Sequence, residues 1–334
     1  MSLPLAGDRV AAAPPFGVPR AIATGIEWLR LPLPFPPHHV NVYRIASDGN
    51  RFLVDTGFRD EATTGLWRAL GMPAADRVIV THFHPDHIGQ AAAFEAAGAR
   101  IYLAAAELTQ ARALCALADA EMETIFTNFF ASQGLRMPAE VVDGNRYRRA
   151  VPALPARAGE LRTGPVPFAG EWRADFAGGH SPAHALLFRA EPPALAAGDI
   201  LLPDITPNIS VWPDDPEADP LAHYLQALAR LRELPPETLV LPAHGNPGCG
   251  LHERVAAIEE HHRRRLNLLR EAARGGRSLR GADAIAILFP ADLKAASLPF
   301  ALGEALAHLN RLWHAGEFER IRDAAGIFCY APRG

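Results

Sequence analysis

The sequence predicts a layered α/β protein that ends in a small domain of helices and a hairpin. Strand-like and helix-like segments alternate up to about residue 260, an order typical of sheets and helices packed in layers. At 334 residues the chain is long enough for one large domain and one small one. Its composition, 49% hydrophobic and 21% charged, is that of an ordinary globular protein.

The N-terminal part of the chain opens with strands. Residues 22–57 contain two β-branched, apolar segments, 40–45 and 51–55, which are separated by a polar turn. A helical pattern follows at 60–70, and the short apolar run at 77–81 is typical of a strand buried on both faces. These residues therefore predict a sheet with a helix beside it.

The next stretch predicts one further strand among helices. An Ala-rich helix over 88–97 and a strand over 100–103 precede one or two helices over 105–133, where Leu, Met and Phe recur at helical spacing. Residues 134–170 are rich in Pro, Gly and Arg and predict an irregular excursion.

The second half repeats the strand and helix pattern and then changes. Strands are predicted at 171–176, 185–190, 194–198 and 238–241, and helices at 218–233 and 251–273. Helical stretches at 281–288 and 300–314 precede a hairpin at 317–330, which is the order of a winged helix. The predicted domains are a flexible segment at 1–21, a catalytic domain at 22–262 with an insertion at about 105–170, and a linker helix with a winged-helix domain at 263–334.

Composition and charge narrow the functional classes. The net charge of −4 is no global signature of nucleic-acid binding, and no run of about 18 apolar residues exists to span a membrane. Three widely spaced cysteines argue against a disulfide framework. The N-terminus lacks the basic region and unbroken apolar run of a signal peptide. We therefore expect a cytoplasmic protein without a membrane partner.

The strongest signal of chemistry is the segment Thr81-His82-Phe83-His84-Pro85-Asp86-His87, which follows a strand and precedes a helix. Alternate residues that leave a strand end point the same way, so His82 and His84 converge on one point. Asp86 and His87, at the start of the helix, face a second point. Imidazole nitrogen and carboxylate oxygen suit zinc, iron or manganese, so the segment predicts a metal site.

Two ion sites need more donors, and three later loops offer them. His180, Asp199 and His244 each follow a strand-like run and stand beside glycine. Glycine at such points lets a loop approach a site closely. One histidine of this kind is more often structural, but the order and strand-end placement of all three together predict ligands.

This ordered set resembles the metallo-β-lactamase superfamily over about residues 22–262. The resemblance implies a four-layer αββα sandwich with a small C-terminal winged-helix domain, and a metal site at one edge of its two sheets. It implies two divalent metal ions, with zinc expected and iron or manganese as alternatives. One ion would be bound by His82, His84 and His180, the other by Asp86, His87 and His244, with Asp199 between them and Asp55 supporting the metal loops.

Departures from the family pattern select a branch. Antibiotic-degrading lactamases commonly place a cysteine in the second site, and flavodiiron oxygen reductases carry a glutamate where this chain has His84. Here no cysteine neighbours a ligand, and no flavin module follows. The order Gly179-His180-x-x-x-His184 instead resembles the glyoxalase II-like hydrolases. We interpret His184 as support for the ligands, with substrate contact as the second interpretation.

The C-terminal segment and the candidate metal ligands together favour a hydrolytic reaction. A winged helix after a long helix resembles the β-lactamase-like protein 2 subgroup, which includes thioester hydrolases acting on carrier-bound acyl chains and a single-stranded RNA nuclease. The first hypothesis is a dinuclear metal hydrolase in which a metal-bridging hydroxide attacks an ester or thioester. Asp86 would be the catalytic residue that accepts the proton, and the substrate a small-molecule or carrier-bound acyl compound.

Other functions stay open at this point. A phosphodiesterase or nuclease would use the seven arginines between residues 261 and 280, although a solvated helix face explains them as well. A DNA-binding regulator would read bases with residues 304–314, which offer only Arg311, Asn310 and two histidines. A mononuclear iron persulfide dioxygenase shares much of the motif, but the full second set of ligands argues against it. A serine hydrolase is disfavoured because the chain has no Gly-x-Ser-x-Gly.

Substrate contacts are predicted by position alone. His38 and His39 follow a proline-rich loop and are candidates for the rim of the site, although exposed loop histidines explain them as well. Trp212 follows Asp199 by a few residues and is a candidate for lining the cleft or filling the core. Three alternatives stay open for the insertion at 105–170: an apolar lid for an acyl chain, a packed helix pair, or the surface of a homodimer.

Overall fold

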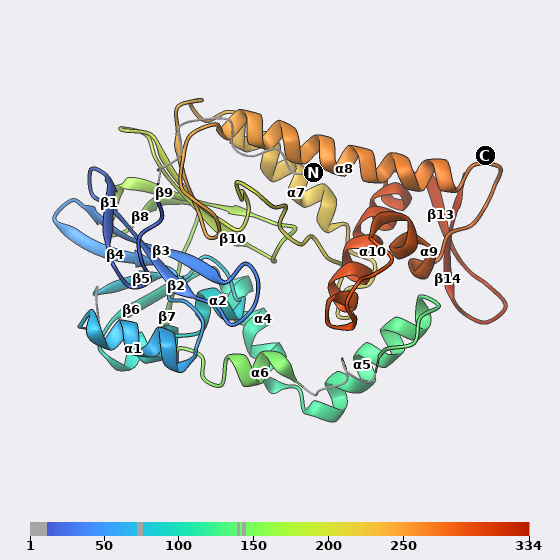
Figure 1. Cartoon of the computed structure of the whole chain (residues 1–334), viewed down its shortest axis with the longest axis horizontal. Coiled ribbons are helices and arrows are strands. Elements are labelled where there is room, and N and C mark those ends of the chain that lie inside the picture. The colour runs from blue at the N-terminus through green and yellow to red at the C-terminus, as the bar shows by residue number, and fades with distance from the viewer. Residues whose placement is uncertain (1–11, 72–75, 139–140, 142–144, 334) are drawn as a thin grey trace. The chain divides into compact units, whose positions relative to one another are not determined.

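The computed structural model describes residues 12–71, 76–138, 141 and 145–333 (Figure 1). The chain divides into two compact units: residues 1–116, 147–207 and 229–255 form the first, and residues 117–146, 208–228 and 256–334 form the second. Residues 1–11 of the predicted flexible segment 1–21 lie outside the described residues, and the first strand, β1, already begins at Arg20.

A seven-stranded sheet forms one half of the first unit. Its strands follow one another in chain order: β1 (Arg20–Ala23), β2 (Ile26–Pro32), β3 (His39–Ser47), β4 (Asn50–Val54), β5 (Arg77–Ile79), β6 (Arg100–Leu103) and β7 (Ala158–Glu160). Neighbours from β1 to β4 are antiparallel, whereas neighbours from β4 to β7 are parallel. The loop with the densest histidines therefore leaves β5 from inside the sheet rather than from its edge.

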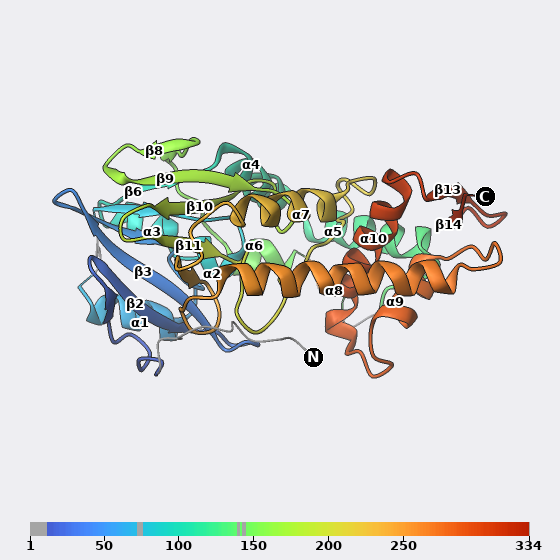
Figure 2. The same ribbon diagram turned by 90° about the horizontal axis from the view of Figure 1, so that it is seen from above.

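A five-stranded sheet packs against the first one. Its spatial order is β12-β11-β10-β9-β8, and its strands are β8 (Gly164–Val166), β9 (Ala169–Ala177), β10 (His184–Arg189), β11 (Ala194–Gly198) and β12 (Leu239–Pro242). Facing side chains of the two sheets form one core, which includes Trp28, Phe52, Trp172 and Leu187. Figure 2 shows the two sheets as adjacent layers. Burial of this apolar surface stabilises the sandwich and holds the strand ends together.

Helices cover the outer face of the seven-stranded sheet. α1 (Glu61–Ala69), α3 (Ala91–Ala96) and α4 (Ala105–Ala116) contribute to a second core, in which Trp67 and Phe94 meet edge to face at 5.0 Å. The sheets and these helices confirm the predicted α/β sandwich.

Two sequence expectations are wrong in detail. The helix expected at about 88–97 is shorter, because α3 covers only Ala91–Ala96 and a separate helical turn, α2 (Pro85–Ile88), precedes it. The chain passes so close to another loop between them that a Cβ at Gly89 would lie 2.8 Å from the carbonyl oxygen of Gly57. The segment 134–170 is not wholly irregular, because it contributes α6 (Arg146–Ala150) and the strands β7 and β8. Local composition missed these short strands because pairing with their neighbours stabilises them.

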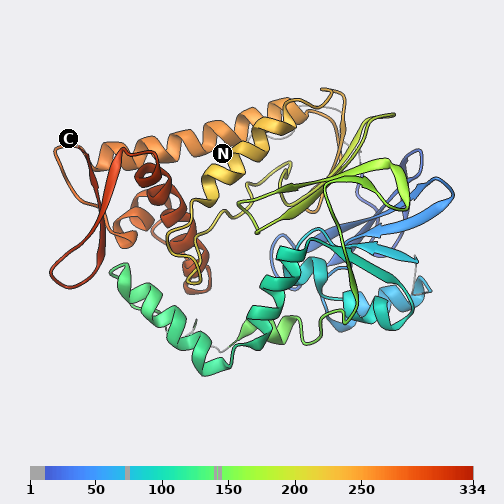
Figure 3. The ribbon, with the colours of Figure 1, turned by 180° about the vertical axis from the view of Figure 1, so that it is seen from behind.

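The second unit consists mainly of helices and ends in a hairpin (Figure 3). It contains α5 (Asp119–Ser132), most of α7 (Pro220–Leu231) and α8 (Leu251–Ala272), α9 (Gly281–Leu288), the 3₁₀ turn η1 (Ala295–Ser297), α10 (Leu298–His314), β13 (Phe318–Arg322) and β14 (Phe328–Pro332). The predicted order of two helices and a hairpin is present at its end. Among the residues described in either unit, no helix combines the length and the apolar character needed to cross a membrane.

A buried histidine pair on α8 and α10 is expected to make the second unit sensitive to acid. Nδ1 of His262 on α8 lies 3.1 Å from Nε2 of His308 on α10, and Nδ1 of His308 donates to the carbonyl oxygen of Glu304 at 2.8 Å. Burial, followed by the charge of Arg265, lowers the pKa of His308 from 6.5 to about 3. The folded chain therefore releases this proton more readily than the unfolded chain does. The contribution of neutral His308 to the free energy of unfolding is therefore complete above pH 6.5 and is lost as the pH falls toward 3.

We accordingly expect the free energy of unfolding to fall between pH 6.5 and 4. Each such histidine contributes a slope of up to about 1.4 kcal/mol per pH unit. The His308→Gln variant has no titrating group at this position and should show a shallower slope in thermal unfolding measured across this range. His314→Gln, which changes an exposed histidine of the same helix, is the matched control. Equal slopes for His308→Gln and the wild-type chain would contradict the expectation.

Candidate metal centre

Four segments at the strand ends of the two sheets supply the predicted ligands. His82 and His84 follow β5, Asp86 and His87 lie on α2, His180 precedes β10, Asp199 follows β11, and His244 follows β12. The structure brings all seven together in two groups, and within each group the ligand atoms lie within 4.8 Å of one another. We call them the first cluster (His82, His84, His180, Asp199) and the second cluster (Asp86, His87, His244).

In the first cluster, three imidazole nitrogens and a carboxylate oxygen lie close together. Nε2 of His82 lies 2.9 Å from Nδ1 of His84 and 3.3 Å from Nε2 of His180. Oδ2 of Asp199 lies 3.2 Å from Nε2 of His180. Burial, followed by the neighbouring His87 and His84, lowers the pKa of His82 well below its usual value. His82 is therefore a neutral imidazole, the form that binds a metal ion.

The second cluster is adjacent, and Asp199 reaches both. Oδ2 of Asp86 lies 3.6 Å from Nε2 of His87 and 3.5 Å from Nε2 of His244. Oδ2 of Asp199 lies 3.6 Å from Nε2 of His87, and its Oδ1 lies 3.4 Å from Nε2 of His244. A single carboxylate between two groups of donors is the arrangement expected of a shared ligand.

Two buried polar atoms show that these residues suit bound cations. Nε2 of His87 and Oδ1 of Asp199 are buried and have no hydrogen-bond partner among the residues that the structure describes. Buried polar atoms without partners cost free energy, so such atoms indicate a ligand. Burial alone would lower the pKa of His87, but Asp86, Asp55 and Asp199 raise it well above its usual value. This concentration of negative charge is what a divalent cation would neutralise.

Asp55 bonds to the loop after β5 and to His87. Its Oδ1 accepts from the backbone N–H of Thr81 at 2.7 Å, and its Oδ2 lies 2.8 Å from Nδ1 of His87. The Thr81 hydroxyl also donates to this carboxylate. Because Nδ1 of His87 donates to Asp55, Nε2 is the ring nitrogen that faces the second cluster. Asp55 holds a left-handed backbone conformation, with φ of +64°, which Asp tolerates better than most residues.

His184 lies behind the ligands rather than among them. Its Nε2 accepts from the backbone N–H of Asp199 at 3.1 Å, and its ring stacks on that of His82 with centroids 4.6 Å apart. A Cβ at Gly198 would collide with the His184 ring, so glycine is needed next to Asp199. His184 therefore contacts two candidate ligands, and its role as their support stays a prediction.

The three candidates for substrate contact lie in different settings. His38 is exposed, whereas His39 accepts from the backbone N–H of Gly245 at 2.9 Å and its carbonyl oxygen accepts from Nδ1 of His244 at 2.8 Å. His39 thus holds the loop of a predicted ligand, a role that the sequence did not indicate. Trp212 belongs to the second unit, where its ring meets Phe126 and Phe300 edge to face.

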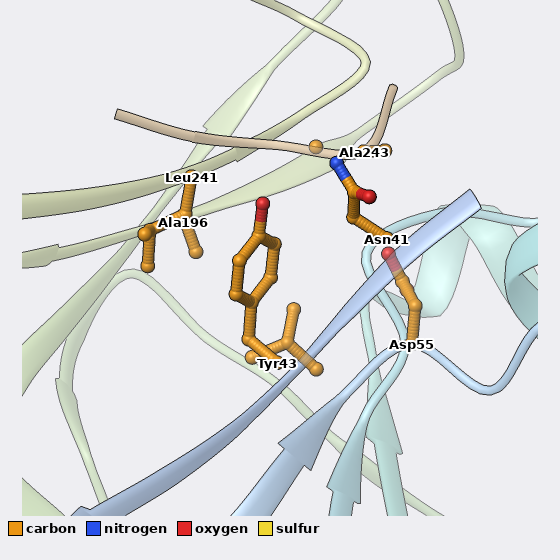
Figure 4. A pocket seen from close by; sticks show the side chains of 8 residues that line it. Asn41, Tyr43, Asp55, Ala196, Leu241 and Ala243 are labelled. Atoms are coloured by element: carbon orange, nitrogen blue, oxygen red, sulfur yellow. The ribbon is translucent and has the colours of Figure 1, made fainter. Parts of the chain in front are cut away.

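Asn41 and Tyr43 were missed by the sequence analysis and also hold the His244 loop. The Asn41 amide donates to the carbonyl oxygens of Pro242 at 2.9 Å and Gly245 at 2.7 Å, and the Tyr43 hydroxyl donates to that of Pro242 at 2.7 Å. Figure 4 shows both side chains, with Asp55, projecting from their strands beneath this loop. A signal was present, because Asn41 interrupts an otherwise apolar run in a buried strand.

Comparisons with known proteins agree with this geometry. Residues 35–244 match the family model described as metallo-beta-lactamase superfamily, and residues 269–333 match the model described as metallo-beta-lactamase-like, C-terminal domain. A beta-lactamase domain protein from Burkholderia ambifaria is 34% identical, with a TM-score of 0.87 over 97% of this chain and 96% of that one. A metallo-beta-lactamase family protein from Thermus thermophilus is 27% identical, with a TM-score of 0.78 over 94% of this chain and 100% of that one. A search among curated proteins gave no match.

Proposed function

Because the chain belongs to the metallo-beta-lactamase superfamily, and has its hydrolase-like fold with a candidate metal site, we propose that it is a dinuclear metal-dependent hydrolase of thioesters or esters. The observation that carries this proposal is the position of Asp199, whose two oxygens reach imidazoles of both clusters. The proposed substrate is a small-molecule or carrier-bound acyl compound.

The proposed roles follow from which atoms face the clusters. The first cluster would hold one divalent ion and the second cluster the other, with Asp199 shared, and zinc is proposed ahead of iron or manganese. When bound, the two ions supply Lewis acidity and a hydroxide nucleophile at neutral pH. Asp86 is the partly exposed member of the second cluster, and its Oδ2 is the proposed acceptor of the proton from the attacking water.

The residues around the clusters favour the glyoxalase II-like branch over antibiotic hydrolysis. The shared position is Asp199, and neither cluster contains a cysteine. His184, the second histidine of the Gly-His-x-x-x-His segment, bonds to the backbone of Asp199. Both features support an acyl hydrolase of this branch.

The nuclease alternative loses support from the pairing of its arginines. Arg263 and Arg264 both bond to Glu260, and Arg270 forms two bonds to Glu317. The other carboxylate contacts in this stretch are Arg265 with Glu304, Arg277 with Asp283 and Arg280 with Asp323. Six of the seven arginines therefore face acids of the same unit, which reduces their attraction for phosphate.

The regulator alternative is weakened in the same way. Asn310 is buried and donates to the carbonyl oxygen of Ala218 at 2.8 Å, while Arg311 bonds to Asp219 at 2.6 Å. His308 is buried against His262. Since side chains that read bases must be free to reach them, this face of α10 does not favour DNA recognition by the proposed winged helix.

A metal and substrate panel tests the proposed function. The purified protein should contain two divalent metal ions per chain and should hydrolyse S-acyl thioesters or lactones faster than bis(p-nitrophenyl) phosphate and single-stranded RNA. Phosphodiester cleavage that exceeded thioester cleavage by orders of magnitude would replace the proposal by the nuclease alternative. One iron per chain with oxygen uptake would replace it by the persulfide dioxygenase alternative.

A further inference from the structure

Glu107 is a buried carboxylate that the sequence analysis did not single out. It lies on the first turn of α4 and is fully buried. Its Oε1 accepts from the Ser181 hydroxyl at 2.7 Å and from the backbone N–H of Ala183 at 2.6 Å, and its Oε2 accepts from the backbone N–H of Phe83 at 3.0 Å. Both carboxylate oxygens are therefore occupied by donors from elsewhere in the chain.

The partners of Glu107 belong to the two loops that carry the histidines of the first cluster. Phe83 stands between His82 and His84 in the loop after β5 of the seven-stranded sheet. Ser181 and Ala183 follow His180 in the loop before β10 of the five-stranded sheet. One carboxylate thus connects two loops that the two sheets supply separately.

The loop after β5 is also held from its other side. The hydroxyl of Tyr147 donates to the carbonyl oxygen of Phe83 at 2.8 Å, so both backbone polar groups of Phe83 are bonded to buried or half-buried side chains. The ring of Phe83 also packs against that of Tyr147, with centroids 5.7 Å apart. These contacts leave the peptide between the two histidines little freedom to rotate.

The donor pattern around Glu107 suits a carboxylate and not an amide. A carboxylate has only acceptors, and it meets three donors here. A glutamine of the same shape would place its NH₂ group against the backbone N–H of either Phe83 or Ala183, and two donors cannot bond to each other. The substitution therefore keeps the volume of the side chain and breaks one side of the connection.

We propose that Glu107 is a positioning residue that sets the metal affinity of the first cluster by holding its two histidine loops in register. The proposal rests on the proposed function only in requiring that the clusters bind metal ions. Outer partners of metal ligands typically contribute about 10- to 100-fold in affinity. We expect Glu107→Gln to lower the affinity of the first cluster by about this factor and to leave the affinity of the second cluster nearly unchanged.

The test measures the binding of cobalt(II) to the metal-free full chain by absorption, in competition with a chelator. His84→Ala and His244→Ala provide the spectra of chains that lack a ligand in the first and in the second cluster. Glu107→Gln should resemble His84→Ala. Glu95→Gln is the matched control, because Glu95 also accepts two backbone N–H groups, those of Ala156 at 2.7 Å and Arg157 at 2.6 Å, away from the metal loops.

A second variant keeps the test decisive if Glu107→Gln does not fold. Ser181→Ala removes one of the three donors and should weaken the first cluster by about 3- to 10-fold. The proposal would be overturned if a folded Glu107→Gln chain kept its cobalt affinity, or if it lost affinity equally in both clusters. If Glu107→Gln cannot be measured, an unchanged cobalt affinity in Ser181→Ala would overturn it. A wild-type chain that binds two ions but cleaves no thioester would refute the proposed substrate alone, and a chain that binds none would refute both.

Discussion

Replacing Asp199 by alanine is expected to lower kcat/KM for hydrolysis by about 10³-fold or more. The carboxylate lies 3.2 Å from Nε2 of His180 in the first cluster and 3.4 Å from Nε2 of His244 in the second. One substitution therefore removes an oxygen donor from both clusters at once. Steady-state kinetics and metal content, measured on the same preparation, should show the loss of activity together with a fall from two ions per chain.

The matched control for this variant is Asp175→Ala. Asp175 is an exposed aspartate on β9 that pairs with Arg230 at 3.4 Å, and surface pairs of this kind contribute little. We expect its activity and metal content to equal those of the wild-type chain. If Asp199→Ala kept both ions and most of its activity, the two clusters would not depend on a shared carboxylate, and the dinuclear proposal would lose its main support.

The Asp55→Asn variant is expected to produce the second large effect. Asp55 accepts from the Thr81 N–H, the Thr81 hydroxyl and Nδ1 of His87, so an amide at this position leaves at least one buried donor without an acceptor. The metal affinity of the second cluster should fall by about 10- to 100-fold, and the free energy of unfolding by about 1 to 3 kcal/mol. Chelator competition and denaturant unfolding measure the two quantities separately.

Asparagine is the informative replacement because it tolerates the backbone of this position. Asp55 has φ of +64°, and Asn adopts this left-handed region at little cost, so the variant tests the carboxylate and not the backbone. Asp48→Asn is the control, since Asp48 also has a positive φ of +52° but lies in an exposed turn. A weakened second cluster in Asp48→Asn, or an intact one in Asp55→Asn, would show that the His87–Asp55 hydrogen bond does not orient the ligand.

The sequence predicted features that depend on neighbouring residues and missed features that depend on contacts between distant parts of the chain. The strand at β5 and the loop after it were predictable, because an apolar run and a dense set of histidines lie within a few residues of each other. The close approach of Gly89 to the carbonyl oxygen of Gly57 was not, because it joins two loops that are distant in the sequence. Glu107 looked like one acid in an alanine-rich helix, since its partners at Phe83 and Ser181 lie far from it in the chain.

By itself the sequence determined the α/β class, the order of nearly all elements and the seven candidate ligands, because periodicity, turn residues and donor type are local properties of the chain. The division of these candidate ligands between two ions was an expectation from the family resemblance, and only the tertiary structure supplies the distances that group them and place Asp199 within reach of both groups. The tertiary structure also decided that His39, Asn41 and Glu107 hold the ligand loops in place. Such contacts join residues up to 206 positions apart, and they exist only once the two sheets have packed and brought their strand ends to one edge.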